Sequence, residues 1–243
     1  MRLDKHLLLQ LFIALFLAHL LADFVFQPNK MARRKTKWQW RALHSVIHVL
    51  LTYALLAKWG LWYIPLFIGV SHYLVDWGKN TIKRQDLPIF VLDQGVHLLI
   101  LVGASLWIYS IFPSVPGWQI WLAPYLWNLA IIICSVILLL PAGGILIGYI
   151  MDPIQQQIEM PAKGLENGGK LIGYLERLLI LTFVMTNQFV GIGFLVAAKS
   201  IFRFSEIKDS NNRKEAEYII IGTFSSFLYA IIVSLLAAKG LLK

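Results

Sequence analysis

The sequence predicts an all-α polytopic membrane protein with about seven transmembrane helices. Of its 243 residues 58% are hydrophobic and only 14% are charged, and the mean hydropathy is +0.67. This composition is too apolar for a soluble domain. Apolar stretches close to the ~20 residues that a membrane-spanning helix needs recur along the chain. The expected spans are residues 6–27, 42–59, 61–77, 88–112, 125–151, 170–197 and 217–238.

Individual spans carry further signals. The first follows a short basic start, MRLDK, but no A-x-A-like cleavage site follows it, so we interpret it as a retained membrane helix. The third span is short. The fifth contains Pro141, Gly143 and Gly144, which predict a kink, a break or a re-entrant segment. The segment FPSVPGW begins at residue 112 and separates two predicted domains, a four-helix domain over 1–112 and a C-terminal helical domain over 113–243.

Four pairs of polar residues lie within apolar sequence, and the two members of each pair are four positions apart. Such a spacing puts both side chains on one face of a helix. Polar side chains inside a membrane are costly unless they are paired or functional. Loop order brings all four pairs near one membrane face, beside the connections 28–41 and 78–87. The pairs are His19/Asp23, His44/His48, His72/Asp76 and Asp93/His97.

The shared spacing and depth of these pairs predict a metal centre. Five imidazoles and three carboxylates suit Zn²⁺ first, with Mn or Fe as alternatives. Eight candidates exceed the needs of one catalytic ion, so we expect two divalent ions, with one ion and a surrounding set of supporting residues as the alternative. Asp23, Asp76 or Asp93 would bridge the ions or act as a base. Polar packing between helices and a metal-free proton path stay open as alternatives.

Residues around the pairs are candidates for substrate binding. Two are amides on or beside the faces of the pairs, and five are basic residues in the adjacent connections, where they would hold an anionic headgroup. The simpler interpretations are amides that meet water and solvated charges that set the topology. The candidates are Gln27, Lys30, Arg33, Arg34, Lys79, Lys83 and Gln94.

The net charge of +9 is unevenly distributed, and the run 30–41 alone carries six basic residues. Basic connections face the cytoplasm, which puts the four pairs near the cytoplasmic face. With seven spans, however, the basic segment 199–214 would face outside, which conflicts with the same rule. No soluble domain presents the basic charge, so we expect no nucleic-acid partner.

The motifs that carry the pairs are similar to a known family. The segments HLLADFVFQPNKMARRK, LHSVIHVL, SHYLVDWGK and DQGVHLL resemble the bacterial membrane family called domain of unknown function 3307, over residues 7–112. The resemblance implies an inner-membrane protein and supplies no activity. The histidine-rich helix ends also resemble, more loosely, those of predicted membrane-bound metal-dependent hydrolases, with which the chain shares no full motif.

We therefore expect an enzyme, a metal-dependent hydrolase that cleaves an ester or phosphoester of a lipid or lipid-linked substrate. A divalent-metal transporter is the alternative, because His19/Asp23 with His72/Asp76 resembles the zinc sites of cation-diffusion-facilitator transporters. A di-iron oxidoreductase acting on lipid is a third possibility. The substrate, the oligomeric state and the role of the C-terminal half do not follow from the sequence.

Overall fold

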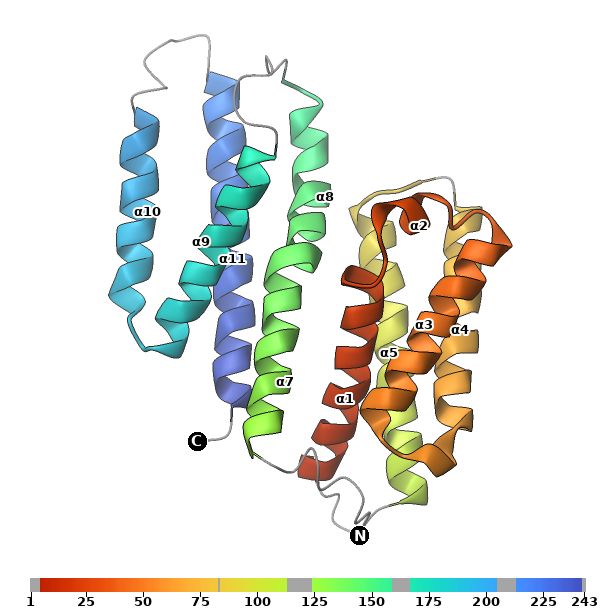
Figure 1. Cartoon of the computed structure of the whole chain (residues 1–243). Coiled ribbons are helices and arrows are strands. Elements are labelled where there is room, and N and C mark those ends of the chain that lie inside the picture. The colour runs from red at the N-terminus through yellow and green to blue at the C-terminus, as the bar shows by residue number, and fades with distance from the viewer. Residues whose placement is uncertain (1–4, 83, 113–123, 159–166, 205–212, 242–243) are drawn as a thin grey trace. The chain divides into compact units, whose positions relative to one another are not determined.

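The computed structural model describes residues 5–82, 84–112, 124–158, 167–204 and 213–241, and these residues form helices with no strand among them (Figure 1). The predicted all-α class is confirmed. By length and composition, four of the described helices could cross a membrane, and they cover His6–Phe24, Leu87–Ile111, Tyr125–Gln155 and Lys214–Gly240. The predicted count of seven spans is not confirmed. Contacts divide the chain into two units, and the boundary between them falls after Cys134.

Residues 5–111 of the N-terminal unit form a four-helix bundle. Each helix runs antiparallel to the next, α1 packs against α3 and α5, and α4 packs against the same two helices (Figure 1). Every helix therefore has two neighbours, and one end of the bundle gathers the end of α1, the start of α3, the end of α4 and the start of α5. The four helices are α1 (Lys5–Phe24), α3 (Trp38–Leu56), α4 (Tyr63–Thr81) and α5 (Leu87–Ile111).

Short connections close the two ends of this bundle. The short helix α2 (Asn29–Arg33) lies in the connection between α1 and α3. At the opposite end α3 stops at Ala57, whose φ of 50° is left-handed, and the 3₁₀ turn η1 (Trp59–Leu61) leads into α4. The start of α5 is capped by Asp86, whose Oδ1 accepts a hydrogen bond from the amide of Ile89 at 3.3 Å.

Apolar side chains fill the half of the bundle nearer to η1. Leu11, Leu15, Leu56, Ile64 and Ile108 are buried there. Close packing of aliphatic side chains in this half stabilises the bundle. The polar groups in the other half therefore need not supply most of its stability. The end of the bundle beside α2 is the polar end.

The helix through Pro141 continues rather than breaking. α7 (Pro124–Ile137) and α8 (Gly143–Gln155) are joined by the π-helical turn η3 (Leu138–Ala142), so the predicted disturbance takes the form of one widened turn. Proline has no amide hydrogen, and a π turn leaves carbonyls without the usual partner. Side chains satisfy two of them: Tyr229 Oη donates to the carbonyl of Leu138 at 2.8 Å, and Arg177 Nε donates to that of Leu139 at 2.5 Å.

The predicted span 170–197 is wrong, because it contains two helices. α9 (Gly168–Met185) ends in a turn at Asn187, whose φ of 56° is left-handed, and α10 (Phe189–Phe204) packs back against α9 (Figure 1). Asparagine tolerates this conformation better than most residues. The apolar sequence continues across the turn, so hydropathy alone gave no sign of the break. The last helix, α11 (Arg213–Gly240), packs against α8 and α9.

Candidate metal centre

The four predicted pairs meet at the polar end of the N-terminal bundle. α1 presents its pair from its last turns, α3 from its first, α4 from its last and α5 from its first half. Each of the eight side chains is at least nine-tenths buried. We call these eight residues the polar layer: His19, Asp23, His44, His48, His72, Asp76, Asp93 and His97.

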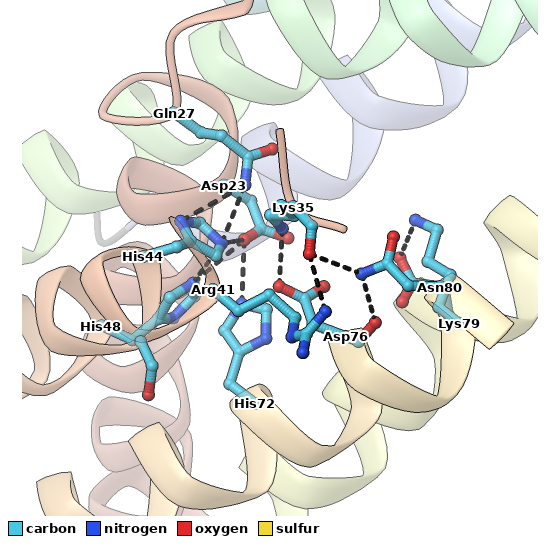
Figure 2. Close-up of polar contacts among 12 residues, drawn as sticks. Asp23, Gln27, Lys35, Arg41, His44, His48, His72, Asp76, Lys79 and Asn80 are labelled. Atoms are coloured by element: carbon cyan, nitrogen blue, oxygen red, sulfur yellow. Dashed lines mark hydrogen bonds and ion pairs between the residues drawn. The ribbon is translucent and has the colours of Figure 1, made fainter. Parts of the chain in front are cut away.

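Asp23 lies at the centre of the polar layer. Its Oδ1 is 3.0 Å from Nε2 of each of His44, His48 and His72 (Figure 2). A carboxylate oxygen has two lone pairs, so three ring nitrogens exceed the hydrogen bonds that this oxygen accepts well. The rings are also crowded, and the centroids of His48 and His72 are 3.6 Å apart.

A ring nitrogen of His44 likewise has more close polar atoms than it can hydrogen-bond. This atom, Nε2, lies 2.9 Å from Nε2 of Gln27, 3.0 Å from Oδ1 of Asp23 and 3.3 Å from Nε2 of His48. One ring nitrogen carries either one hydrogen or one lone pair, so it can serve only one of these three groups. A cation that accepts several lone pairs at once would resolve the conflict.

A second group of ligand atoms lies beside the first. Oδ1 of Asp93 and Nε2 of His97 are 3.6 Å apart, and both are buried without a hydrogen-bond partner among the described residues. Buried polar atoms normally have a partner. The same is true of Nδ1 of His72.

The polar layer thus offers three overlapping sets of ligands, and within each set the ligand atoms all lie within 4.8 Å of one another. Nitrogen and oxygen donors with no thiolate suit zinc, manganese or iron. The first two sets share His72 and the last two share Asp76, whereas the first and third have no residue in common, so the described geometry could hold more than one ion. They are His19, Asp23, His48 and His72; His44, His72 and Asp76; and Asp76, Asp93 and His97.

The two predicted amides contact the polar layer directly. Gln27 donates to the ring of His44. Gln94 donates from Nε2 to Oδ2 of Asp23 at 3.4 Å and to Oδ2 of Asp93 at 3.3 Å, and its Oε1 lies 3.4 Å from Nε2 of His19. Gln94 therefore links the ligand set around Asp23 to the set around Asp93. Residues that orient metal ligands hydrogen-bond to them in this way.

The predicted basic residues separate into two groups. Lys79 lies at the polar layer, with its Nζ 2.7 Å from Oδ2 of Asp93. Lys30, Arg33 and Arg34 are exposed, and within the described ranges no hydrogen bond or ion pair joins them to the polar layer. Lys83 lies outside the described residues.

Three residues that the sequence analysis missed also contribute. Lys35, in the connection after α2, places its Nζ 2.7 Å from Oδ2 of Asp76. Arg41 and Asn80 hold this connection, because both donate to the carbonyl of Lys35, at 2.9 and 3.3 Å (Figure 2). Helical spacing could have found two of them: Asn80 continues the face of His72 and Asp76, and Arg41 precedes His44 by three residues. Lys35 lies on no such face.

Comparison with known proteins gives one match. The model of the family described as "Protein of unknown function (DUF3307)" matches residues 11–139. The match starts slightly later than the expected residue 7 and continues past the expected end at residue 112, so it includes α7. No curated protein and no solved structure matches the chain. The matched segment covers more than half of the 243 residues and contains all four His/Asp pairs, and the chain therefore belongs to the DUF3307 family.

Proposed function

We propose that this protein is a metal-dependent membrane hydrolase that cleaves an ester or phosphoester of a lipid or lipid-linked substrate. The site would hold two divalent ions, zinc in the first place and manganese or iron as alternatives. One observation carries the proposal: three ring nitrogens converge on a single carboxylate oxygen of Asp23, beside ligand atoms of Asp93 and His97 that have no hydrogen-bond partner in the described part of the chain. Hydrogen bonds alone satisfy neither arrangement, whereas cations satisfy both.

Two neighbouring ions supply hydrolytic chemistry by activating water and by stabilising the attacking and leaving oxygens. Among the three aspartates, Asp76 belongs to two of the three ligand sets, so we assign it as the aspartate that the two ions would share through one oxygen. Gln27 and Gln94 orient His44, Asp23 and Asp93 through their amides. The ions would be held by imidazoles and carboxylates that four separate helices fix in place, which favours a preorganised site.

The depth of the polar layer supports a lipid substrate. Tryptophan is enriched where membranes meet water. The exposed Trp38 and Trp77 lie at the polar end of the bundle, and the exposed Trp59 and Trp62 lie at the other end. His44 follows Trp38 by six residues, or about 9 Å of helix, and Asp76 adjoins Trp77. A lipid headgroup would therefore lie at the level of the site.

Charge and topology support a cytoplasmic position in a bacterial inner membrane. The connection between α1 and α3 carries the basic run 30–41, and basic connections stay in the cytoplasm. Counting α9 and α10 as two passes reverses the chain once more than the predicted seven spans did. If both helices cross the membrane, Lys199 near the end of α10 would lie on the same side as the run 30–41, in agreement with the same rule.

A metal transporter has less support from the geometry. Transport needs a polar path through the whole bundle. The half opposite to the polar layer is instead filled by aliphatic side chains, among them Leu11, Leu15, Ile64 and Ile108. No specific observation favours the di-iron oxidoreductase.

Metal analysis of the full chain, purified in detergent without chelator, tests the proposal. We expect about two zinc, manganese or iron ions per chain, a loss of metal in His72→Ala and Asp93→Ala, and no loss in His6→Ala, whose imidazole is exposed at the start of α1. A wild-type protein without stoichiometric metal contradicts the proposal. Two assays then separate the functions. A hydrolase should turn over lipid phosphoesters or esters, whereas a transporter should carry metal into sealed vesicles.

A further inference from the structure

We propose that Lys35 and Lys79 together bind the phosphate group of the substrate, so that the hydrolysed bond is a phosphoester rather than a carboxylic ester. This inference rests on the proposed function and names the substrate class of the same site. It starts from two ion pairs that the structure forms at one edge of the polar layer, between Lys35 and Asp76 and between Lys79 and Asp93.

The two lysines reach the polar layer from different parts of the bundle. Lys35 comes from the connection after α2, and Lys79 comes from the last turn of α4. Their carboxylate partners both belong to the ligand set completed by His97. The two ammonium groups therefore flank the same candidate ion.

Each lysine leaves its carboxylate able to bind a metal. Nζ of Lys79 contacts Oδ2 of Asp93, whereas Oδ1 of Asp93 lies near His97 without a hydrogen-bond partner in the described part of the chain. Nζ of Lys35 likewise contacts Oδ2 of Asp76. One oxygen of each aspartate can face the lysine while the other faces an ion, so the lysines and the ions do not compete for one atom.

The lysines lie on the solvent side of the polar layer. The side chains of Lys35 and Lys79 are 15% and 25% exposed, against 5% for each of their aspartate partners. A solute that approaches this edge of the layer meets the ammonium groups before it meets the carboxylates.

The charge of the site favours a phosphate. Three carboxylates and two ammonium groups leave one net negative charge when the histidines are neutral. Two divalent ions would turn this into three net positive charges in a poorly hydrated place, which is costly without an anion. A phosphomonoester supplies close to two negative charges and a phosphodiester supplies one, whereas an uncharged carboxylic ester supplies none.

The remaining hydrogen-bonding capacity matches the same ligand. An ammonium group has three donors, and each lysine uses one donor on its aspartate, so two donors remain on each. A phosphomonoester offers three strongly accepting oxygens, and a phosphodiester offers two. Nη1 of Arg41 donates to the backbone carbonyls of Lys35 and Thr36 and so holds the connection that carries Lys35 in place.

Phosphate binding to the manganese-loaded full chain tests the inference. The protein is placed in phosphatidylcholine nanodiscs, and paramagnetic broadening of ³¹P signals is measured for dissolved orthophosphate and, in separate discs, for phosphatidate. The variants are Lys35→Gln, Lys79→Gln, their double variant and Lys79→Arg. Lys37→Gln is the matched control, because Lys37 is exposed, lies two residues after Lys35 and, within the described residues, makes no hydrogen bond or ion pair with the polar layer.

We expect the wild type and Lys37→Gln to bind the phosphate group equally. The double variant should keep its manganese and bind phosphate about tenfold more weakly, the effect of losing charge-assisted hydrogen bonds. Lys79→Arg should retain most of the affinity because it retains the charge. Broadening of phosphatidate assigns a lipid source for the phosphate, and broadening of orthophosphate alone assigns a soluble one; either supports the role of the two lysines.

Two outcomes overturn the inference without touching the metal centre. One is wild-type protein that holds manganese and broadens neither phosphate signal; the other is a double variant that holds manganese and binds phosphate as well as the wild type. If the double variant does not fold, Lys79→Gln compared with Lys79→Arg decides the same question. Protein that holds no metal contradicts the proposed function instead.

Discussion

Asp23 illustrates, at the scale of a single residue, how position gives an ordinary side chain an unusual environment. Its carboxylate is the negative charge on which three imidazoles converge, and Gln94 and His19 lie at its second oxygen. A buried carboxylate is stable only when it is well paired. The same contacts make Asp23 the residue whose charge the candidate metal centre depends on most.

Asp23→Asn should therefore remove metal while preserving the fold. Asparagine has nearly the same size, but it lacks the charge and replaces one acceptor oxygen by a donor. We expect metal affinity to fall at least tenfold, which is roughly the loss that changing a supporting residue alone can cause. The affinity is measured by dialysing each variant against buffers of known free zinc concentration and determining the bound zinc by elemental analysis. Asp152→Asn, at an exposed aspartate of α8, should bind metal like the wild type, and equal metal in Asp23→Asn would refute the role assigned to Asp23.

At the scale of the element, Gly69 sets the distance between α3 and α4. The carbonyl of Gly69 accepts a hydrogen bond from Oγ of Ser45 at 2.5 Å, and a Cβ at residue 69 would collide with Val49 and lie 3.3 Å from the carbonyl oxygen of Ser45. Only glycine permits this approach. The approach in turn brings the rings of His48 and His72 together at the polar end of the same two helices.

Gly69→Ala should force α3 and α4 apart. We expect a loss of about 1–3 kcal/mol of unfolding free energy, typical of overpacking, together with weaker metal binding because the imidazoles separate. Gly78→Ala on the same helix is the control, since no atom lies within 4 Å of a Cβ there. Alanine should be neutral or favourable at Gly78 by up to about 1 kcal/mol. Denaturant unfolding in detergent and metal titration measure both effects, and equal behaviour of the two variants would show that the close approach is unimportant.

At the scale of the whole molecule, hydropathy and charge set the orientation in the membrane. The N-terminal bundle presents exposed aliphatic side chains outward, among them Leu50 and Leu99, while its ends carry exposed tryptophans. Most of its basic residues lie at the end that holds the polar layer, whereas Lys5 and Lys58 lie at the other end. These features together predict that the polar end faces the cytoplasm.

Cysteine labelling in intact cells tests this orientation. The chain has one cysteine, the buried Cys134, so Cys134→Ala provides a background without reactive thiols. In that background we expect Gly60→Cys, at the turn η1, to react with a membrane-impermeant maleimide from outside. Thr36→Cys, in the connection after α2, should react only after the inner membrane is made permeable. The reverse pattern would place the polar layer on the outer face and contradict the cytoplasmic assignment.

Much of the fold and of the candidate site was accessible from local sequence patterns. The positions of α1, α3, α4 and α5 followed from apolar length, and the four pairs followed from a spacing of four residues, which helical geometry converts into a shared face. The break at Asn187 was not accessible, because it depends on one backbone conformation within sequence that stays apolar on both sides. Pro141 predicts a disturbance of its helix, but the π turn that forms there is supported by Arg177 and Tyr229 from other helices.

The sequence by itself determined the all-helical membrane class and the convergence of the four pairs at one end of a bundle, because hydropathy, helical periodicity and loop order are properties of the chain alone. Only the tertiary structure decided which atoms meet. It put Oδ1 of Asp23 among three imidazoles, joined Lys35 to Asp76, and left Lys30 and Arg33 outside the polar layer. The physical reason is that the reach of a connection depends on where its two helices end and how closely they pack, and no local pattern contains that information.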